Sequence, residues 1–89
     1  MAITSKGNPI RKPTMQLVRS YNRTWDEMES MLESAEERRR EWQMFFERAK
    51  RINNKQSMKD AARNCKALEG VIKTLKWTLG EEGINDPLE

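Results

Sequence analysis

Residues 42–68 read WQMFFERAKRINNKQSMKDAARNCKAL, and this stretch decides the fold. On each side of its polar centre, residues 53–56, apolar residues recur at alternating steps of three and four. The spacing continues outward in both directions as Val18, Tyr21, Trp25, Met28, Leu32, Ala35, Trp42, Phe46 and Ala49, and as Met58, Ala61, Cys65, Leu68, Ile72, Leu75 and Leu79. Two amphipathic helices joined by a short turn form an antiparallel hairpin. We therefore predict an all-α, coiled-coil-like helical hairpin.

The first helix has two candidate starting points. The heptad spacing holds without a slip from Met15 to Asn53, which favours one continuous helix over about 15–53. Thr24-Trp25-Asp26-Glu27, however, matches a capping box, in which the first and fourth residues bond each other's backbone N–H groups. A start at this box would leave residues 15–22 as a separate short helix. We expect the continuous helix.

The second helix is bounded by a capping box and a glycine. Ser57-Met58-Lys59-Asp60 predicts its start, and Gly80 suits the left-handed position after its last turn. The flanking segments contain prolines and glycines, which interrupt helices. The predicted organisation is a flexible basic arm at 1–13, a helical hairpin at 14–80 with a turn at 54–57 and a second helix at about 58–79, and an irregular tail at 81–89.

The two predicted helices differ in length. At 1.5 Å per residue the second spans about 33 Å, so about 25 Å of the first would project beyond it. A bare apolar stripe of that size is unusual on a soluble monomer. We expect a second copy to cover it, giving a dimeric four-helix bundle. The expected interface is Leu17, Val18, Tyr21, Trp25, Met28, Met31 and Leu32.

Other coverings of this stripe remain open. The tail could fold back and place Ile84, Pro87 and Leu88 over it. Residues 15–22 could pack back as a third helix, or a different protein could bind.

Charge is segregated along the chain, although the net charge is only +3. Residues 26–37 contain six acids and no base, whereas residues 38–55 contain seven bases and two acids. A basic tip around the turn suits contact with phosphate or an acidic protein surface, and a solvated helix surface has the same composition. The candidate contacts are Arg48, Lys50, Arg51, Lys55, Lys59, Arg63 and Lys66, together with Trp77 at an outward heptad position.

Arg39 is the one charged residue at a core heptad position. We expect it opposite Ile72, within reach of Glu69 or of an acid from another chain. A single polar residue in a helical seam can fix register and partner number. It can also extend its charged end into solvent.

Several kinds of chemistry have no support in the composition. The chain has no histidine, one cysteine and four scattered glycines, so we expect no enzyme activity, no cofactor, no structural metal and no phosphate-binding loop. Cys65 falls at a core heptad position, where we expect a small buried apolar residue. No window approaches the roughly 18 apolar residues that a membrane span needs. We expect a cytoplasmic protein.

These features favour a binding role. The first hypothesis is a regulatory or adaptor protein that self-associates and binds a protein partner through the basic tip or the Trp77 face. The alternative is a nucleic-acid-binding accessory protein that contacts backbone phosphate through the tip and the N-terminal arm.

Overall fold

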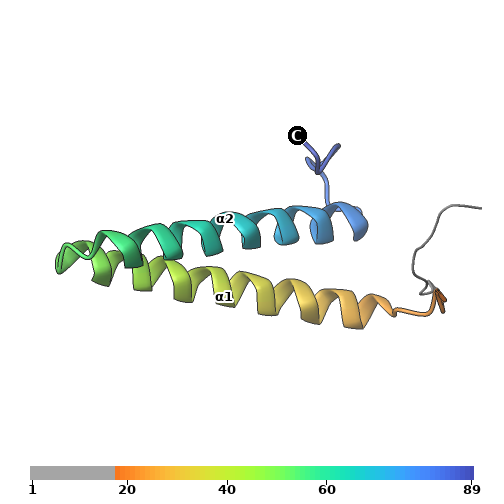
Figure 1. Ribbon diagram of the computed structural model, residues 1–89. Helices are drawn as coiled ribbons and strands as arrows, with labels where there is room; N and C mark the ends of the chain where they lie inside the picture. Colours follow the sequence, from red (N-terminus) through yellow and green to blue (C-terminus); the bar gives the residue numbers. More distant parts are fainter. Residues whose placement is uncertain (1–17) are drawn as a thin grey trace, which may run out of the picture.

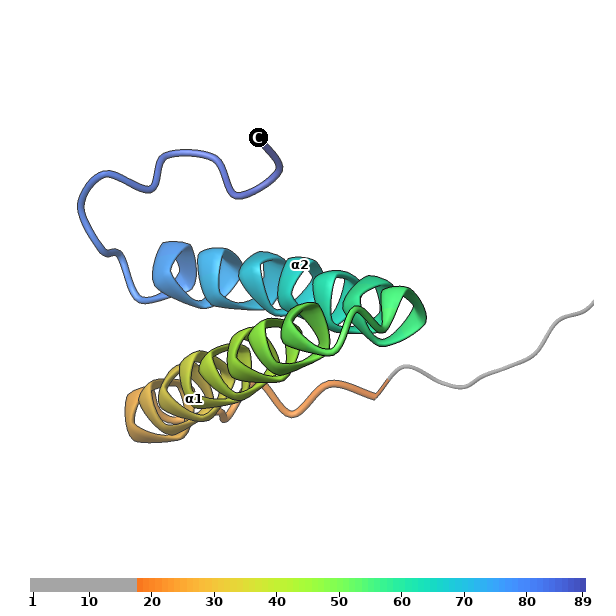
Figure 2. The same cartoon turned by 90° about the vertical axis from the view of Figure 1, so that its left-hand side faces the viewer.

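The computed structural model describes residues 18–89. They form two α-helices, α1 (Trp25–Arg51) and α2 (Lys55–Thr78), joined by a short connection. The helices run side by side in opposite directions, close together at the connection and diverging toward the open end (Figures 1 and 2). No strand occurs within the described residues. The predicted all-α helical hairpin is confirmed.

α1 begins at Trp25 because Thr24 caps it. The Thr24 hydroxyl accepts a hydrogen bond from the Glu27 N–H (3.0 Å), and the Glu27 carboxylate accepts one from the Thr24 N–H (2.9 Å). Tyr21, three residues before Thr24, has a left-handed backbone (φ 58°), which a right-handed helix does not accommodate. Residues 18–24 accordingly contain no helix. The prediction of one continuous helix from residue 15 was wrong.

The late start of α1 removes the predicted overhang. α1 has 27 residues and α2 has 24, so the two helices are nearly equal in length. The prediction of a first helix that projects far beyond the second was therefore wrong, because no helix carries the apolar spacing of residues 18–24. The predicted arm at 1–13 and the interface residue Leu17 lie outside the described residues.

α1 ends in a Schellman motif within the connection, residues 52–54. Asn53 adopts the left-handed conformation (φ 59°), and its N–H donates to the Lys50 carbonyl (3.1 Å). The Asn54 N–H donates to the Ala49 carbonyl (2.9 Å). These two bonds satisfy carbonyl groups that the end of a helix otherwise leaves unpaired.

Asn54 also starts α2. Its side-chain oxygen accepts a hydrogen bond from the Ser57 N–H (3.1 Å), which makes Asn54 the N-cap and Lys55 the first helical residue. The predicted start at residue 58, with Ser57 as the cap, was wrong. The Ser57 N–H donates to the side chain of Asn54, so Ser57 lies inside the first turn of α2. Asp60, the expected partner in that box, instead accepts a hydrogen bond from Gln56 (3.1 Å).

The end of α2 matches the prediction. Gly80 is left-handed (φ 77°), and its N–H donates to the Trp77 carbonyl (3.0 Å). The Glu81 N–H donates to the Lys76 carbonyl (2.9 Å), which completes a second Schellman motif. Residues 81–89 form turns without a helix or strand.

The tail does not cover α1. After α2 it turns to the far side of that helix, away from α1, in both Figure 1 and Figure 2. Leu88 is 93% exposed and Trp25 is 65% exposed. The alternative in which the tail folds back over Trp25 is not what the structure shows.

Only alanines are fully buried between the helices. Ala35, Ala49 and Ala61 are 4%, 3% and 0% exposed, and no larger side chain among residues 18–89 reaches this degree of burial. The larger residues of the two heptad series line the same contact but are only half-buried: Leu32, Trp42, Phe46, Met58, Cys65, Leu68, Ile72, Leu75 and Leu79. The two helices thus cover much of these larger side chains but fully enclose none of them.

Candidate interaction surfaces

The two sides of the hairpin differ in chemistry. One side, here called the ion-pair face, carries the salt bridges between the helices. The Arg39 guanidinium lies 3.2 Å from the Glu69 carboxylate, which confirms the predicted partner, and the Lys76 ammonium lies 3.9 Å from the Glu36 carboxylate. These side chains are 29–44% exposed, so each pair contributes modestly to stability.

The other side, here called the apolar face, exposes four large apolar residues: Met31, Phe45, Ile52 and Val71. Met31 and Phe45 are fourteen residues apart, which places them on one side of α1, and Ile52, the C-cap of α1, follows Phe45 by seven residues. Phe45 and Ile52 line a groove together with Ser57 of α2. Val71 follows Ser57 by fourteen residues, so it lies on that same side of α2. Their exposed fractions are 58%, 38%, 74% and 43%.

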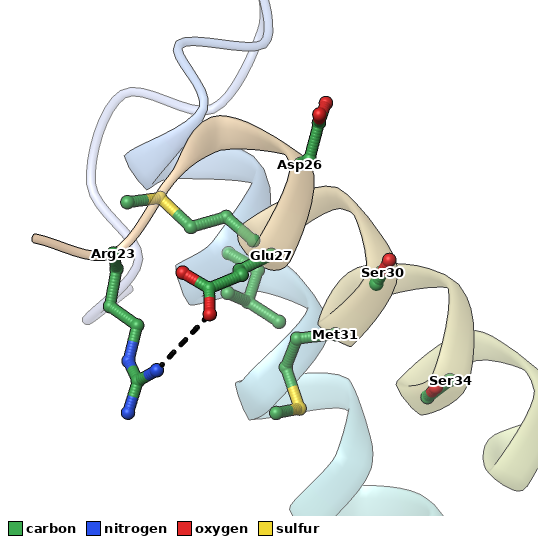
Figure 3. Close-up of a pocket in the computed structure, with 8 residues that line it drawn as sticks. Arg23, Asp26, Glu27, Ser30, Met31 and Ser34 are labelled. Carbon is green, nitrogen blue, oxygen red and sulfur yellow. Dashed lines mark hydrogen bonds and ion pairs between the residues drawn. The ribbon is translucent and has the colours of Figure 1, made fainter.

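The apolar face contains a groove at the open end of the hairpin. This depression of about 640 Å³ lies where the helices diverge, and Met31 lines it together with Leu75 of α2. Glu27 lies beside Met31 along the groove. In Figure 3 both side chains project from successive turns of α1, and the Arg23 guanidinium contacts the Glu27 carboxylate at 3.3 Å.

A second groove lies on the same face near the connection. It has a volume of about 300 Å³ and is lined by Phe45, Arg48, Ala49, Ile52 and Ser57. The Arg48 guanidinium carbon lies 5.9 Å from the centre of the Phe45 ring, and that ring packs against Trp42 at 5.5 Å between centroids. The groove at the open end is therefore lined by two carboxylates, Asp26 and Glu27, and one guanidinium, Arg23, whereas the groove near the connection carries the Arg48 guanidinium and no carboxylate.

The Glu27 carboxyl group is surrounded by groups that favour its ionised form. The hydrogen bond from the Thr24 N–H lowers the pKa of the Glu27 carboxyl below its usual value, and the positive charge of Arg23 lowers it further. Glu27 is therefore ionised whenever the capping box is formed near neutral pH.

The basic tip is exposed around the connection. Residues 48–59 contain five bases and no acid, and within residues 18–89 none of the five lies within 4.0 Å of a carboxylate. These five are Arg48, Lys50, Arg51, Lys55 and Lys59. The other two predicted contacts are paired: Arg63 lies 3.7 Å from Asp60, and Lys66 lies 3.9 Å from Glu69.

The predicted interface residues no longer form one helical stripe. Val18 and Tyr21 are exposed and lie outside α1, whereas Met28 and Leu32 are half-buried toward α2. Among the predicted residues, Met31 is a large exposed member of the apolar face. Trp77 points away from α1, as predicted, and is 50% exposed, because Leu75 and Leu79 on either side of it face α1.

Sequence reasoning missed Phe45, Ile52 and Val71 as surface candidates. For α1 the available signal was a third apolar position in the heptad, occupied by Met31, Phe45 and Ile52 at steps of seven or fourteen residues. A third apolar position per heptad is typical of helices that pack in a larger bundle rather than in a pair. The signal is weak because Arg38 occupies the same position between Met31 and Phe45.

Residues 18–89 contain neither a cluster of metal-ligating side chains nor a membrane-spanning helix. No group of three or more histidine, cysteine, aspartate or glutamate side chains within residues 18–89 could hold a metal ion. Neither α1 nor α2 is long and apolar enough to cross a bilayer. Comparison of the chain with protein-family models, curated proteins and solved structures finds no match.

Proposed function

We propose that this chain is a non-enzymatic helical interaction module that self-associates through its apolar face and presents its basic tip to a partner. The observation that carries the proposal is the shortage of enclosed apolar surface. Only three alanines are fully buried within the described residues, while Met31, Phe45, Ile52 and Val71 are exposed on one side. Small domains are already marginal in stability, so a hairpin with so little core gains much from association.

The exposed area is large enough to matter. The exposed fractions of the four side chains add up to about two complete residues. Full burial of one such residue is worth about 1.5–3 kcal/mol, so closing the face supplies about 3–6 kcal/mol per copy. Two copies together gain about 6–12 kcal/mol, which is comparable with the estimated cost of association of about 4–15 kcal/mol. The half-buried neighbours Trp42 and Leu75 add to this gain.

Light scattering of the intact chain tests self-association. The expected mass is a multiple of 10.5 kDa. Phe45→Asp combined with Val71→Asp should give the monomer mass. Met44→Asp is the control, because Met44 lies two residues from both Trp42 and Phe46 and so faces away from α2. A monomeric parent at concentrations of about 100 μM, or equal effects of the two variants, would refute the proposal.

A second candidate function is contact with nucleic-acid phosphate through the basic tip. It is favoured by five exposed cations in residues 48–59 that have no carboxylate partner within the described residues. Such binding should appear as a mobility shift on duplex DNA at about 50 mM salt and weaken steeply as salt is added. Charge reversal at Arg51, Lys55 and Lys59 should abolish it. Absence of any shift at that salt concentration would leave an acidic protein surface as the partner of the tip.

A further inference from the structure

We infer that the occupant of the apolar face is a second copy of this chain in antiparallel orientation, with α1 lying on α1 of the partner and the two basic tips at opposite ends. The inference rests on the proposed self-association and adds its geometry. It follows from the spacing of apolar and charged residues about Arg38, which is the middle residue of α1.

The two large residues that α1 contributes to the apolar face are placed symmetrically. Met31 lies seven residues before Arg38, and Phe45 lies seven residues after it. A two-fold axis through this level, perpendicular to the helix, therefore brings Met31 of one copy beside Phe45 of the other. Such a contact is isologous: the same patch serves both copies, and each contact occurs twice.

The charges of the two grooves agree with the same axis. Glu27 lies eleven residues before Arg38, in the groove at the open end, and Arg48 lies ten residues after it, in the groove at the tip. An antiparallel copy places each Glu27 carboxylate beside an Arg48 guanidinium. A parallel copy would place Glu27 against Glu27 and Arg48 against Arg48. Complementary charge of this kind sets orientation more than it sets affinity.

The charges along the whole of α1 are distributed as this arrangement requires. Residues 26–37 carry six acids and no base, and residues 38–51 carry six bases and two acids. Antiparallel contact aligns each acidic half with a basic half. Arg38 itself, near the axis, has no ion pair within the described residues, and neither does Glu41, which lies one turn from Arg38 on the side of Phe45. The Glu41 carboxylate is therefore available to the partner's guanidinium at that position.

α2 supports the same axis independently. The two salt bridges between the helices, Arg39–Glu69 and Glu36–Lys76, show which residues of α1 and α2 lie opposite each other, and they place the position opposite Arg38 between residues 70 and 74 of α2. Val71, the large exposed apolar residue of α2 on this face, lies at that level. A residue at the level of a two-fold axis contacts the same residue of the other copy. Val71 of one α2 therefore meets Val71 of the partner's α2, and this single pair supplies the apolar contact between the two α2 helices.

Distance measurements between spin labels test the orientation. The labels are attached to Lys59→Cys near the tip and to Glu29→Cys near the open end, each in a Cys65→Ala background so that no other thiol is present. With the axis at residue 38, two Lys59→Cys sites lie about 33–45 Å apart, since each is about 11–15 residues from the level of the axis at 1.5 Å per residue. A mixed sample with one label of each kind should instead give a distance within about 20 Å, because the two sites then share one end of the bundle.

The outcomes separate the geometry from the self-association. A distance within about 20 Å between two Lys59→Cys sites would overturn the antiparallel arrangement and leave self-association in place. A monomer mass in light scattering, with no distance between copies, would overturn both. Equal circular dichroism at 222 nm for the labelled and parent chains checks that the variants keep the hairpin.

Discussion

Met31 and Met44 form a matched pair for testing the apolar face. Both are methionines in α1, and both are 58% exposed. Met31 lines the groove at the open end, whereas Met44 faces away from α2. Met→Ala therefore changes helix propensity equally at the two positions and differs only in what lies opposite the side chain. Met31→Ala should weaken self-association, and Met44→Ala should not.

The size of the effect follows from the exposed fraction. Closing the face removes the exposed 58% of Met31 from water in each of two copies. At about 1.5–3 kcal/mol for a complete side chain, this amounts to about 2–3.5 kcal/mol per dimer, an upper value because alanine keeps its methyl group. The dissociation constant should rise by about 20- to 300-fold.

Sedimentation equilibrium over a range of concentrations measures this change. Circular dichroism at 222 nm should show equal helix content for both variants at concentrations where the parent is associated. A Met31→Ala constant within about threefold of the parent would refute the reasoning. An equal loss in Met44→Ala would also refute it, because that result would place the contact on another side of α1.

Three further predictions concern the ends of the helices. Thr24→Ala should destabilise the hairpin by about 0.5–2 kcal/mol in urea unfolding, because it removes the hydroxyl that accepts from the Glu27 N–H; an unchanged midpoint would argue against the capped start of α1. The folded-state pKa of Glu27 is lowered, so the stability that its carboxylate contributes should be complete above the unfolded pKa of about 4.3 and be lost as pH falls through the lower folded value. The difference in unfolding free energy between the parent and Glu27→Gln should therefore shrink between about pH 5 and pH 2. A difference that stays constant over that range would contradict the lowered pKa of Glu27. Asn53→Ala should destabilise by about 1 kcal/mol, whereas Asn53→Gly should not destabilise, because the position requires φ near +59°; thermal unfolding of the two variants compares them, and equal losses would contradict the left-handed role.

Periodicity predicted the two helices and their facing residues, but it did not predict where the first helix begins. Val18, Tyr21 and Trp25 keep the heptad spacing, yet spacing alone does not distinguish helix from irregular chain. The local capping box at Thr24 and the left-handed backbone at Tyr21 decide the boundary. A complete capping box is therefore a stronger signal for the start of this helix than an unbroken apolar spacing.

The start of α2 shows the same competition between local signals. Asn54 and Ser57 are both good N-caps and lie three residues apart. The choice is made by the end of α1: Asn53 takes the left-handed position, and Asn54 follows in an extended conformation suited to a cap. Arg39 was predictable with its partner Glu69 because the hairpin register fixes both. The apolar face was not predicted, because Arg38 interrupts the row of Met31, Phe45 and Ile52 that marks this side of the hairpin.

The alanines between the helices have a consequence for how this protein melts. Since Ala35, Ala49 and Ala61 are the fully buried residues of the described chain, the free energy that holds a single hairpin is small. In the self-association that we propose, a second copy supplies the missing core, so unfolding and dissociation become one event governed by mass action. We then expect the temperature at which the helices are lost to rise with total protein concentration, and the isolated chain to be largely unfolded in dilute solution.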